Sequence, residues 1–579
     1  MVVGHAVQAV VTIEGRELDR RLKPYLEQVV VDDHLHLPDA FTLTFFDPER
    51  DILEQAGLRI GARVEISGAA LGSQDEKRLI HGEVTALEAD YDALGARIVA
   101  RGYDLSHRLQ RGRRTRTFLN VSDSDIARKI ADDAKIEVGT IEPTTDTYEH
   151  VSQANLSDWD FLTARARRIG YEVAVIDGTF HFRRPEESSA APGEGDLRST
   201  DPRQLVFGRD RGLLEYHPRV TAAEQVAQVE VRGWDREHKE AVVASTGAFT
   251  LSAAIEGTSP ARLARLFGSP RFVAGEGEIE TENEAAAAAD AIAEMIGSAF
   301  AEAEGIARGD PALKAGSAVS VAGVADGFAG TFVLSHTRHV FDRDGYRTHF
   351  EISGRHERSL LGLTGNGGAP TASGNGARQR MYGLVTALVT ANDDQLGRVK
   401  LRFPWLDPDY ESDWARVARF EAGADSGAIF IPQVDDEVLV GFEFGDIDHP
   451  VVLGGLHNGV DKPRLGDGLF DNGKVKRRGF VSRSGHVLVF YDGTGADPSG
   501  ISLQTSDSRL VVALDASGKY VHIYGDPKVV IEAQRELEVT SKGDLTMTAG
   551  GSLTIKARGK LAIQSDAVVD VDGKVIQLN

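Results

Sequence analysis

The sequence contains no cysteine in its 579 residues. This absence excludes disulfide bonds, thiol catalysis and thiolate zinc sites. No stretch approaches ~20 uninterrupted apolar residues, so we expect no membrane span and no stable membrane association. The N-terminal segment has no charged leading region and is interrupted by His5, Gln8 and Glu14. We therefore expect no cleaved signal peptide and assembly in the cytoplasm.

Positive charge and aromatic side chains are both scarce. Lys plus Arg number 65 against 88 Asp plus Glu, giving a net charge of −23. Such an acidic chain repels phosphate backbones, which disfavours general nucleic-acid binding. Aromatic residues make up 7% while Gly numbers 62, a mixture that favours turns and sheets over a helical bundle. The chain is too long for one core, so we predict two to four domains and a mainly β fold.

The C-terminal residues 519–579 carry an internal repeat of eight residues. The blocks read KYVHIYGD, PKVVIEAQ, RELEVTSK, GDLTMTAG, GSLTIKAR, GKLAIQSD and AVVDVDGK. The second and fourth places are mostly polar, and glycine recurs at the block boundaries. The third and fifth places are apolar in every block: Val521, Ile523, Val529, Ile531, Leu537, Val539, Leu545, Met547, Leu553, Ile555, Leu561, Ile563, Val569 and Val571.

Each block is typical of a short strand followed by a turn, with one apolar face set by alternation. Two inward residues per strand are too few to build a core in one narrow chain, and a single copy leaves open strand edges. We therefore predict an intertwined, triple-stranded β-helix in which the fourteen residues fill the axis of a homotrimer. A single-chain β-solenoid or a plain meander is the alternative interpretation.

A small barrel is predicted in the middle of the chain. Residues 362–380 are rich in Gly, Ser and Pro and indicate a linker. Short strands at regular spacing follow in residues 381–461, which suggests a small closed barrel. Residues 462–518 contain further strands that connect this barrel to the repeat.

Three segments of this region carry a family resemblance: GRVKLRFPW (Gly397 to Trp405), WARV (Trp414 to Val417) and Ile431 to Asn458. They resemble the OB-fold core of VgrG proteins, the spikes of type VI secretion and related contractile injection systems, which the phage baseplate V protein shares. The family usually has Gly-Asp-Glu-Val where this chain has Asp435-Asp436-Glu437-Val438. The octad tail resembles the trimeric needle of the same family. We expect these residues in the OB core: Phe403, Pro404, Trp405, Trp414, Pro432, Val438 and Phe442.

Residues 1–361 resemble the hub of the same architecture, related to phage late control protein D. The resemblance implies two related barrels per subunit, so that three subunits present six similar surfaces to a sixfold tube. Ser157 is a predicted N-cap of a short helix that ends near Gly170, and a second helix begins at Ser122-Asp123. An Ala-rich helix is predicted over 284–303, packed on a barrel.

Three patterns suggest small-molecule or metal sites. GLFDNGKV (Gly468 to Val475) matches the first seven places of a phosphate-binding loop, but Val475 replaces the Ser or Thr that holds Mg²⁺, so we expect a turn. His34 and His36 are two apart, as for a metal pair on a strand, yet no third ligand has motif spacing. His336 and His339 are three apart, which places them on opposite strand faces. We predict no metal and no cofactor.

The run HRLQRGRRTR (His107 to Arg116) is the one sharply basic segment in an acidic hub. Nucleic-acid binding through this run or through the OB barrel is one interpretation, although the barrel's aromatics Phe403 and Trp405 are expected in the core. We favour an interface, in which arginines pair with carboxylates across subunits or on the tube. The candidate residues are Arg108, Arg111, Arg113, Arg114 and Arg116.

The resemblance implies a structural and mechanical function, a trimeric spike that docks on a hexameric inner tube and pierces a target envelope upon sheath contraction. The implied partners are the tube, baseplate proteins, a PAAR-type tip seated near Leu578, and cargo effectors, within a particle fired out of the cell. No nucleophile elbow, HExxH or helical carboxylate pair is present, so we predict no enzyme. A spike carrying a peptidoglycan hydrolase or effector activity, and an OB-type nucleic-acid binder, are the alternatives.

Overall fold

The computed structural model divides into two compact units, Met1–Asn458 and Gly459–Asn579. The predicted linker 362–380, Gly468 and Leu578 lie outside the described residues. Those are residues 9–70, 73, 75–93, 95–193, 201–208, 212–275, 279–355, 381–465, 469–471, 473–493 and 498–577.

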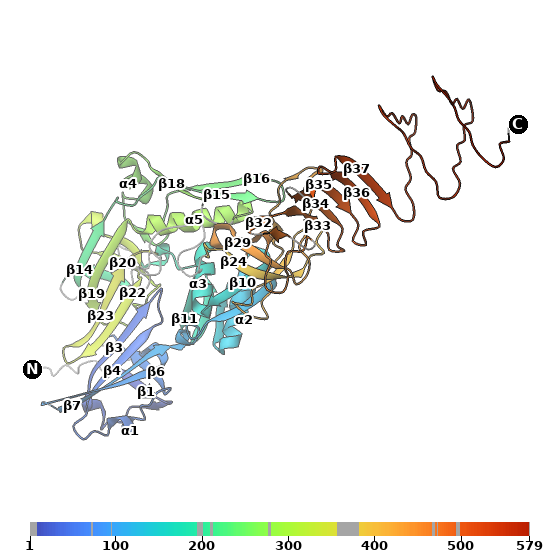
Figure 1. Ribbon diagram of the computed structural model, residues 1–579. Helices are drawn as coiled ribbons and strands as arrows, with labels where there is room; N and C mark the ends of the chain where they lie inside the picture. The colour runs from blue at the N-terminus through green and yellow to red at the C-terminus, as the bar shows by residue number, and fades with distance from the viewer. Residues whose placement is uncertain are drawn as a thin grey trace, which may run out of the picture. The chain divides into compact units, whose positions relative to one another are not determined.

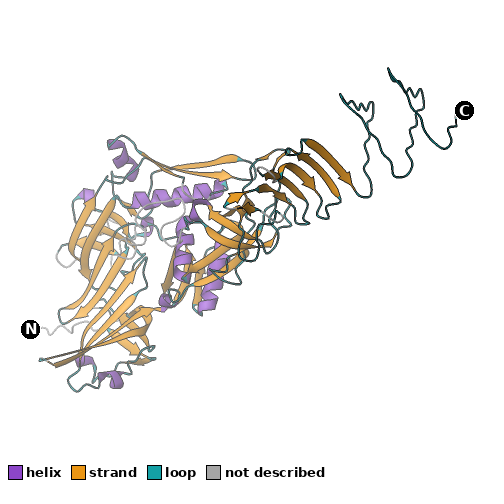
Figure 2. Ribbon diagram, in the orientation of Figure 1, coloured by secondary structure: helices purple, strands orange, loops and turns teal. Residues whose placement is uncertain are grey.

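The first unit is mainly β, with short helices between the strands (Figure 2). Fifteen of its strands form one continuous sheet in the order β17-β21-β20-β13-β14-β19-β23-β22-β3-β4-β7-β6-β5-β1-β2. These strands are β1 Val10–Ile13, β2 Arg16–Glu17, β3 Leu26–His34, β4 Ala40–Phe46, β5 Arg63–Gly68, β6 Lys77–Asp92, β7 Gly95–Asp104, β13 Gln204–Phe207, β14 Gly212–Val220, β17 Ala253–Ala254, β19 Ala301–Arg308, β20 Ala318–Ala322, β21 Gly330–Val333, β22 His336–Asp342 and β23 Gly345–Ile352.

This sheet carries two hydrophobic cores. One is built on β1 to β7 and includes Phe41, Leu43 and Phe45, while the other is built on β13, β14 and β19 to β23 and includes Phe300 and Phe350. The antiparallel pairing of β3 with β22 joins the two halves, which lie next to each other in Figure 1. The two barrels that the resemblance implies are therefore two halves of one sheet.

Smaller sheets and helices complete the hub. The pair β8–β10 and the sheet β11-β12-β9 enclose a third core with α2 and α3, and the sheet β16-β15-β18 forms a fourth core with α5. The bounds are β8 Arg114–Ser122, β9 Glu137–Ile141, β10 Thr147–Leu156, β11 Glu172–Ile176, β12 Thr179–Arg183, β15 Gln228–Asp235, β16 Glu240–Gly247, β18 Arg271–Ala274, α1 Ile52–Ala56, α2 Asp123–Ala134, α3 Asp158–Arg168, α4 Pro260–Leu266 and α5 Glu282–Ser298, with short 3-10 turns η1 Lys23–Tyr25, η2 Leu105–Arg108, η3 Ser188–Ala190 and η4 Asp326–Phe328.

Serine side chains begin α2 and α3 as predicted. The Ser122 hydroxyl accepts a hydrogen bond from the backbone N–H of Asp125 in a capping box, and the Ser157 hydroxyl accepts one from the N–H of Asp160. The Ala-rich helix α5 is shorter than the predicted 284–303. It ends at Ser298, and β19 already begins at Ala301 because that segment pairs with β14 and β23.

The OB domain is a five-stranded sheet in the order β25-β24-β29-β30-β26. An isolated bridge between Val399 and Ala415 links the β25 edge to the β26 edge, which closes the barrel. Its elements are β24 Val385–Ala391, β25 Lys400–Arg402, β26 Arg416–Val417, β27 Ala422–Gly423, β28 Ser426–Gly427, β29 Glu437–Phe442, η5 Glu443–Gly445 and β30 Pro450–Gly455.

The second unit begins with a short hairpin and continues as an antiparallel meander. The hairpin pairs β31 Phe470–Asp471 with β32 Lys474–Val475. The meander runs in chain order through β33 Arg477–Val481, β34 Val487–Asp492, β35 Ser499–Gln504, β36 Leu510–Asp515 and β37 Tyr520–Gly525. The first octad therefore forms the last strand of the meander, and it is paired within the chain rather than belonging to the tail.

Candidate functional surfaces

The octad tail beyond β37 is extended and has no partner strand within the described residues. No backbone–backbone hydrogen bond forms inside residues 527–577, and the side-chain bonds there are local, such as Thr540 Oγ1 to Glu538. The fourteen apolar residues at the third and fifth places are between 49% and 72% exposed. A strand with both edges open and an exposed apolar stripe is a template for pairing with other chains.

The meander presents an apolar face that the sequence analysis did not identify. Cross-strand partners share a face, and two rows of partners run across it: Phe480, Leu488, Leu503, Val512 and Ile523, then Phe490, Ile501, Leu514 and Val521. Leu503 is 58% exposed, seven of the other residues on this face are 37% to 63% exposed, and Leu488 is half-buried. The alternation in ISL (501–503) and LVVAL (510–514) is the signal that could have revealed it. We call these nine residues the meander face.

The OB core contains some of the predicted residues, while others lie at its rim. Phe403 and Val438 are fully buried, and Phe442 packs with its ring centroid 5.7 Å from that of Phe403. Trp405 is 46% exposed and Pro404 is exposed, so these two positions differ from the prediction. The Trp405 indole N–H donates to the carbonyl of Thr386 at 3.0 Å, which holds the ring across the outside of the barrel.

Trp414 and Pro432 are half-buried at the same barrel. The ammonium of Lys400 lies over the Trp414 ring, 5.5 Å from its centroid. The carbonyl of Pro432 accepts a hydrogen bond from the Asn392 side-chain amide at 2.8 Å. Both residues therefore anchor loops on the barrel surface and do not fill its core.

The barrel and the hub share a buried polar junction. The hydroxyls of Ser152 and Tyr410 lie 3.0 Å apart and both residues are 4% exposed. The backbone N–H of Ser152 donates to Asp448 at 3.0 Å, and Arg236 pairs with Glu443 at 3.1 Å. Burial raises the pKa of Tyr410, which keeps its hydroxyl protonated. These pairs are hundreds of residues apart in sequence, which explains why local patterns gave no sign of them.

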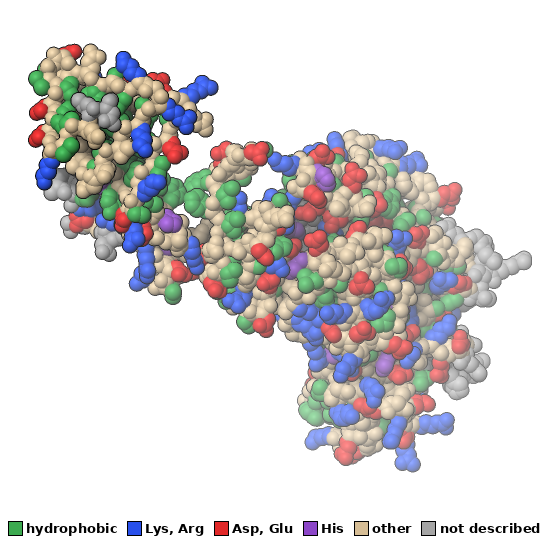
Figure 3. Space-filling model, turned by 90° about the vertical axis from the view of Figure 1, so that its right-hand side faces the viewer, with side chains coloured by type: hydrophobic (Ala, Val, Ile, Leu, Met, Phe, Trp, Pro, Cys, Tyr) green, Lys and Arg blue, Asp and Glu red, His purple; other side chains and the backbone are tan. Residues whose placement is uncertain are grey.

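Of the predicted interface arginines, Arg108 lies on η2, Arg114 and Arg116 lie on β8, and Arg111 and Arg113 lie on the loop between these elements. Several have partners within the chain. Arg108 binds Glu83, Arg116 binds Asp133 and Asp158 at 2.7 Å each, and Arg114 lies 3.5 Å from Asp158. Arg113 donates to the carbonyl of Asn155 at 3.1 Å, while Arg111 is exposed. Burial raises the pKa of Glu83, but hydrogen bonds from Arg108 and His107 outweigh it and hold that pKa below its usual value. On the face drawn in Figure 3, Lys and Arg side chains (blue) are interspersed with Asp and Glu side chains (red).

The four histidines considered as metal ligands, His34, His36, His336 and His339, contact other side chains or backbone groups of the hub. His34 and His336 have ring centroids 5.2 Å apart, and the His34 ring nitrogen accepts from the N–H of His36. Burial lowers the pKa of His336, but its bonds with Asp32 and Glu351 outweigh this and raise the pKa to about 9. His339 is buried, lies 2.8 Å from the Tyr346 hydroxyl, and has a pKa lowered to about 3 by burial. Within the described ranges, no group of three or more His, Cys, Asp or Glu is arranged to hold a metal ion.

Two further sequence patterns have clear structural outcomes. The part of the phosphate-loop-like motif that is described forms the β31–β32 hairpin, and no helix follows it there. This is the turn that the sequence predicts. No helix among the described residues has the length and apolar character needed to cross a bilayer.

Comparisons with known proteins agree with this architecture. The family described as Alg8 N-terminal domain matches residues 5–342, and the Type VI secretion system/phage-baseplate injector OB domain matches residues 382–457. The type VI secretion system spike protein VgrG5 of Pseudomonas aeruginosa is 36% identical over 132 residues, 21% of this chain and 15% of that protein. The spike protein VgrG2a of the same organism is 39% identical over 74 residues, 12% of this chain and 9% of that protein. The alignments thus span under two thirds of these relatives.

A solved structure has a similar fold along most of the chain. A chain in the structure of the lidded Francisella PdpA–VgrG complex aligns with 90% of this chain and over 81% of its own length, with a TM-score of 0.52 and 10% identity. At that identity, the similarity concerns the fold alone. The OB-domain match and the spike-protein relatives support a structural role as a spike or hub. Because the first family spans more than half of the sequence, the chain belongs to the Alg8 N-terminal domain family, in a protein that is a VgrG-like spike.

Proposed function

We propose that this protein is the homotrimeric spike of a contractile injection system. Its hub docks on a hexameric inner tube, and its tail forms a needle that pierces the target envelope when the sheath contracts. The observation that carries the proposal is the octad tail beyond β37: its apolar side chains at the third and fifth places are exposed, and the backbone of residues 527–577 has no strand partner in the described part of the chain. The single-chain solenoid and the plain meander need intrachain pairing, which residues 527–577 lack.

Three intertwined copies give every strand of the tail two neighbours. The apolar third and fifth places then meet at the axis, where each residue that is now 49% to 72% exposed becomes buried. The meander face continues the same stripe through Val521 and Ile523 into β36, β35 and β34. A needle of this kind resists load, because no strand peels away without breaking the hydrogen bonds to both neighbours.

The proposed partners follow from this arrangement. Six similar hub surfaces in the trimer match a sixfold tube, and baseplate proteins surround the hub. Arg111, which is exposed on the loop after η2, is the arginine of the basic run best placed for a carboxylate of the tube or of a neighbouring subunit. A PAAR-type tip on the needle and cargo effectors complete the set.

The proposed role requires no catalysis, since sheath contraction supplies the work. VgrG5 and VgrG2a are named as spike proteins, which supports a structural role, while another relative is named as an actin cross-linking toxin. Zymography on peptidoglycan with the purified full chain checks this part of the proposal. A cleared band would contradict it.

The axis is tested by placing a charge in it. Leu553→Asp brings three carboxylates together at one level of the trimer, so we expect trimerisation to be lost or strongly reduced. Thr554→Asp is the matched control, because the neighbouring residue lies on the opposite side of the strand. Light scattering on both variants reads the result. A Leu553→Asp protein that stays trimeric and as heat-resistant as the unmodified chain would overturn the axis assignment.

A further inference from the structure

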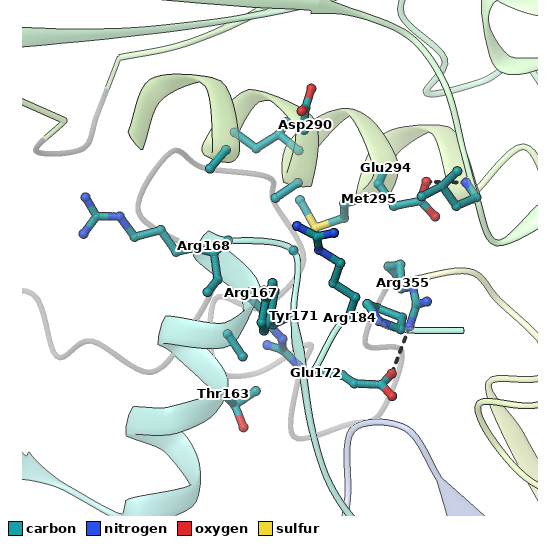
Figure 4. Close-up of a pocket in the computed structure, with 18 of the residues that line it drawn as sticks. Thr163, Arg167, Arg168, Tyr171, Glu172, Arg184, Asp290, Glu294, Met295 and Arg355 are labelled. Atoms are coloured by element: carbon teal, nitrogen blue, oxygen red, sulfur yellow. Dashed lines mark hydrogen bonds and ion pairs between the residues drawn. The ribbon is translucent and has the colours of Figure 1, made fainter. Parts of the chain in front are cut away.

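A cavity of about 480 Å³ lies in the hub between α3 and α5 (Figure 4). Residues of the segments 169–173, 184–187 and 249–251, together with Leu35, His36 and Arg355, form the rest of its walls. This volume falls within the range of pockets that bind small molecules or short segments of a partner. Neither the octad tail nor the basic run contributes to it.

One wall of this cavity is apolar and made of small side chains. Ala287, Ala291 and Met295 follow one another at helical spacing on α5 and line the pocket, half-buried. The neighbouring face of α5, with Ala285, Ala289 and Ile292, packs into the core under β15 and β16. Because alanine fills little space, the inner face of α5 leaves room for the apolar part of a ligand.

Guanidinium groups supply unused hydrogen-bond donors to the cavity. Arg184 extends across it toward Met295 in Figure 4, and its guanidinium carbon lies 5.9 Å from the centroid of the Tyr171 ring. Among the described residues, no carboxylate lies within 4 Å of Arg184. Arg355 lies 3.5 Å from Glu172, but its buried Nε atom has no hydrogen-bond partner within the described part of the chain.

The deeper carboxylates of the cavity wall are already engaged. Glu294 accepts hydrogen bonds from the backbone N–H groups of Leu251 (2.6 Å) and Ser252 (3.2 Å) and from the Ser252 hydroxyl (2.5 Å). Glu172 is shared by Arg355 and by Arg183, the latter at 3.3 Å. Burial raises the pKa of both Glu172 and Glu294. The wall therefore keeps spare guanidinium donors. One buried acceptor, Glu172 Oε2, also has no hydrogen bond within the described part of the chain, but it lies 3.5 Å from the Arg355 guanidinium.

We propose that this cavity binds a single carboxylate joined to a short apolar chain. Arg184 and Arg355 provide planar donors that suit a carboxylate, and the α5 wall accepts the apolar part. The carboxyl groups of Glu172 and Asp290 in the lining disfavour a ligand with two negative charges. A free fatty acid and an acidic side chain within an apolar peptide segment share this chemistry.

The test is isothermal titration calorimetry on the full chain with four probes. Octanoate and the peptide Ac-Leu-Asp-Leu-Leu-NH2 carry the carboxylate, while octanamide and Ac-Leu-Asn-Leu-Leu-NH2 are the neutral counterparts. We expect saturable binding of at least one carboxylate probe and binding of its neutral counterpart weaker by about tenfold or more. Binding of octanoate alone identifies the free acid as the source, and binding of the peptide alone identifies a protein segment.

Variants connect the binding to this cavity. Arg184→Gln is expected to lower the affinity for the carboxylate probe by about tenfold. The affinity of Arg184→Lys is expected to lie between that of Arg184→Gln and that of the unmodified chain. Ala291→Trp fills the apolar side and is expected to abolish binding. Arg21→Gln, an exposed arginine outside the cavity, is the matched control and is expected to bind normally.

Three results would overturn the proposal. These are no saturable binding of either carboxylate probe, equal affinity for the neutral counterparts, or unchanged binding by Arg184→Gln. Light scattering and far-UV circular dichroism on the same samples confirm that each variant keeps its mass and fold. Light scattering tests the proposed trimer and calorimetry tests the proposed binding site, so the two proposals can fail independently of each other.

Discussion

Asp104 is buried at the end of β7, beside the half-buried carboxyl groups of Asp33 and Asp39. The site adjoins a cavity of only about 40 Å³ at the contact between the two halves of the hub sheet. Asp33 accepts a hydrogen bond from the N–H of Ala315, and Asp104 accepts one from the Ser106 hydroxyl at 2.5 Å. Burial raises the pKa of Asp104 to about 7, and the pKa values of Asp33 and Asp39 are also raised by burial.

A raised folded-state pKa makes hub stability depend on pH in a defined direction. The folded state holds the Asp104 proton more tightly than the unfolded state, so this contribution is present below pH ~4 and is lost as pH rises to about 7. Asp104→Asn removes the ionisation, and its amide oxygen still accepts from Ser106. We expect the melting temperature of the variant, relative to the unmodified chain, to increase from pH 4 to pH 7 and then level off. Thermal melts along that series measure it, and a pH-independent difference would contradict the assignment.

Because Ser152 and Tyr410 are hydrogen-bonded at the hub–barrel junction, we expect removal of the Tyr410 hydroxyl alone to lower the stability of the protein. Tyr410→Phe keeps the ring and removes the hydroxyl, leaving the buried Ser152 hydroxyl without that partner. We expect a loss of roughly 1 to 3 kcal/mol in stability. Urea unfolding followed by tryptophan fluorescence checks it. Tyr91→Phe is the control on the exposed surface, with an expected change near zero; an equal effect in both variants would argue against a role for the junction.

At the scale of elements, local chemistry predicted the starts of helices better than their ends. The serine caps of α2 and α3 follow from one side chain and its neighbours in sequence. The end of α5 depends on pairing of the alanines at 301 and 303 with distant strands, so helix propensity extended the predicted helix too far. The same reason explains Trp405: its exposure is fixed by a hydrogen bond to Thr386 on another strand, which residue type does not encode.

The meander face gives an element-scale prediction. Leu503 lies in its centre, paired with Leu488 on one side and Val512 on the other. If this face is buried between copies, Leu503→Glu places charge in an apolar contact, and we expect a loss of trimer stability of a few kcal/mol. Gln504→Glu, on the opposite face of the same strand, is the control and is expected to have little effect. Heat-induced dissociation followed by native gel compares them, and equal behaviour of the two variants would argue against burial.

At the scale of the whole molecule, a repeating sequence pattern was the best guide to which side chains share a face. The octad stripe needs no tertiary information, because its period directly sets which side chains share a face. The order of the hub strands depends instead on pairs far apart in the chain, such as β3 with β22, and neither local patterns nor the family resemblance predicted it. The cavity beside α5 and the hub–barrel junction likewise arise from segments that are distant in sequence.

The central claim is that the tail hides its apolar stripe only by association of three copies. The most direct measurement is the native mass of the purified full chain by multi-angle light scattering over a dilution series. The account predicts a particle of three times the 62.5 kDa chain mass, with a protease-resistant tail. A stable species of one chain mass whose tail still resists proteolysis would contradict it.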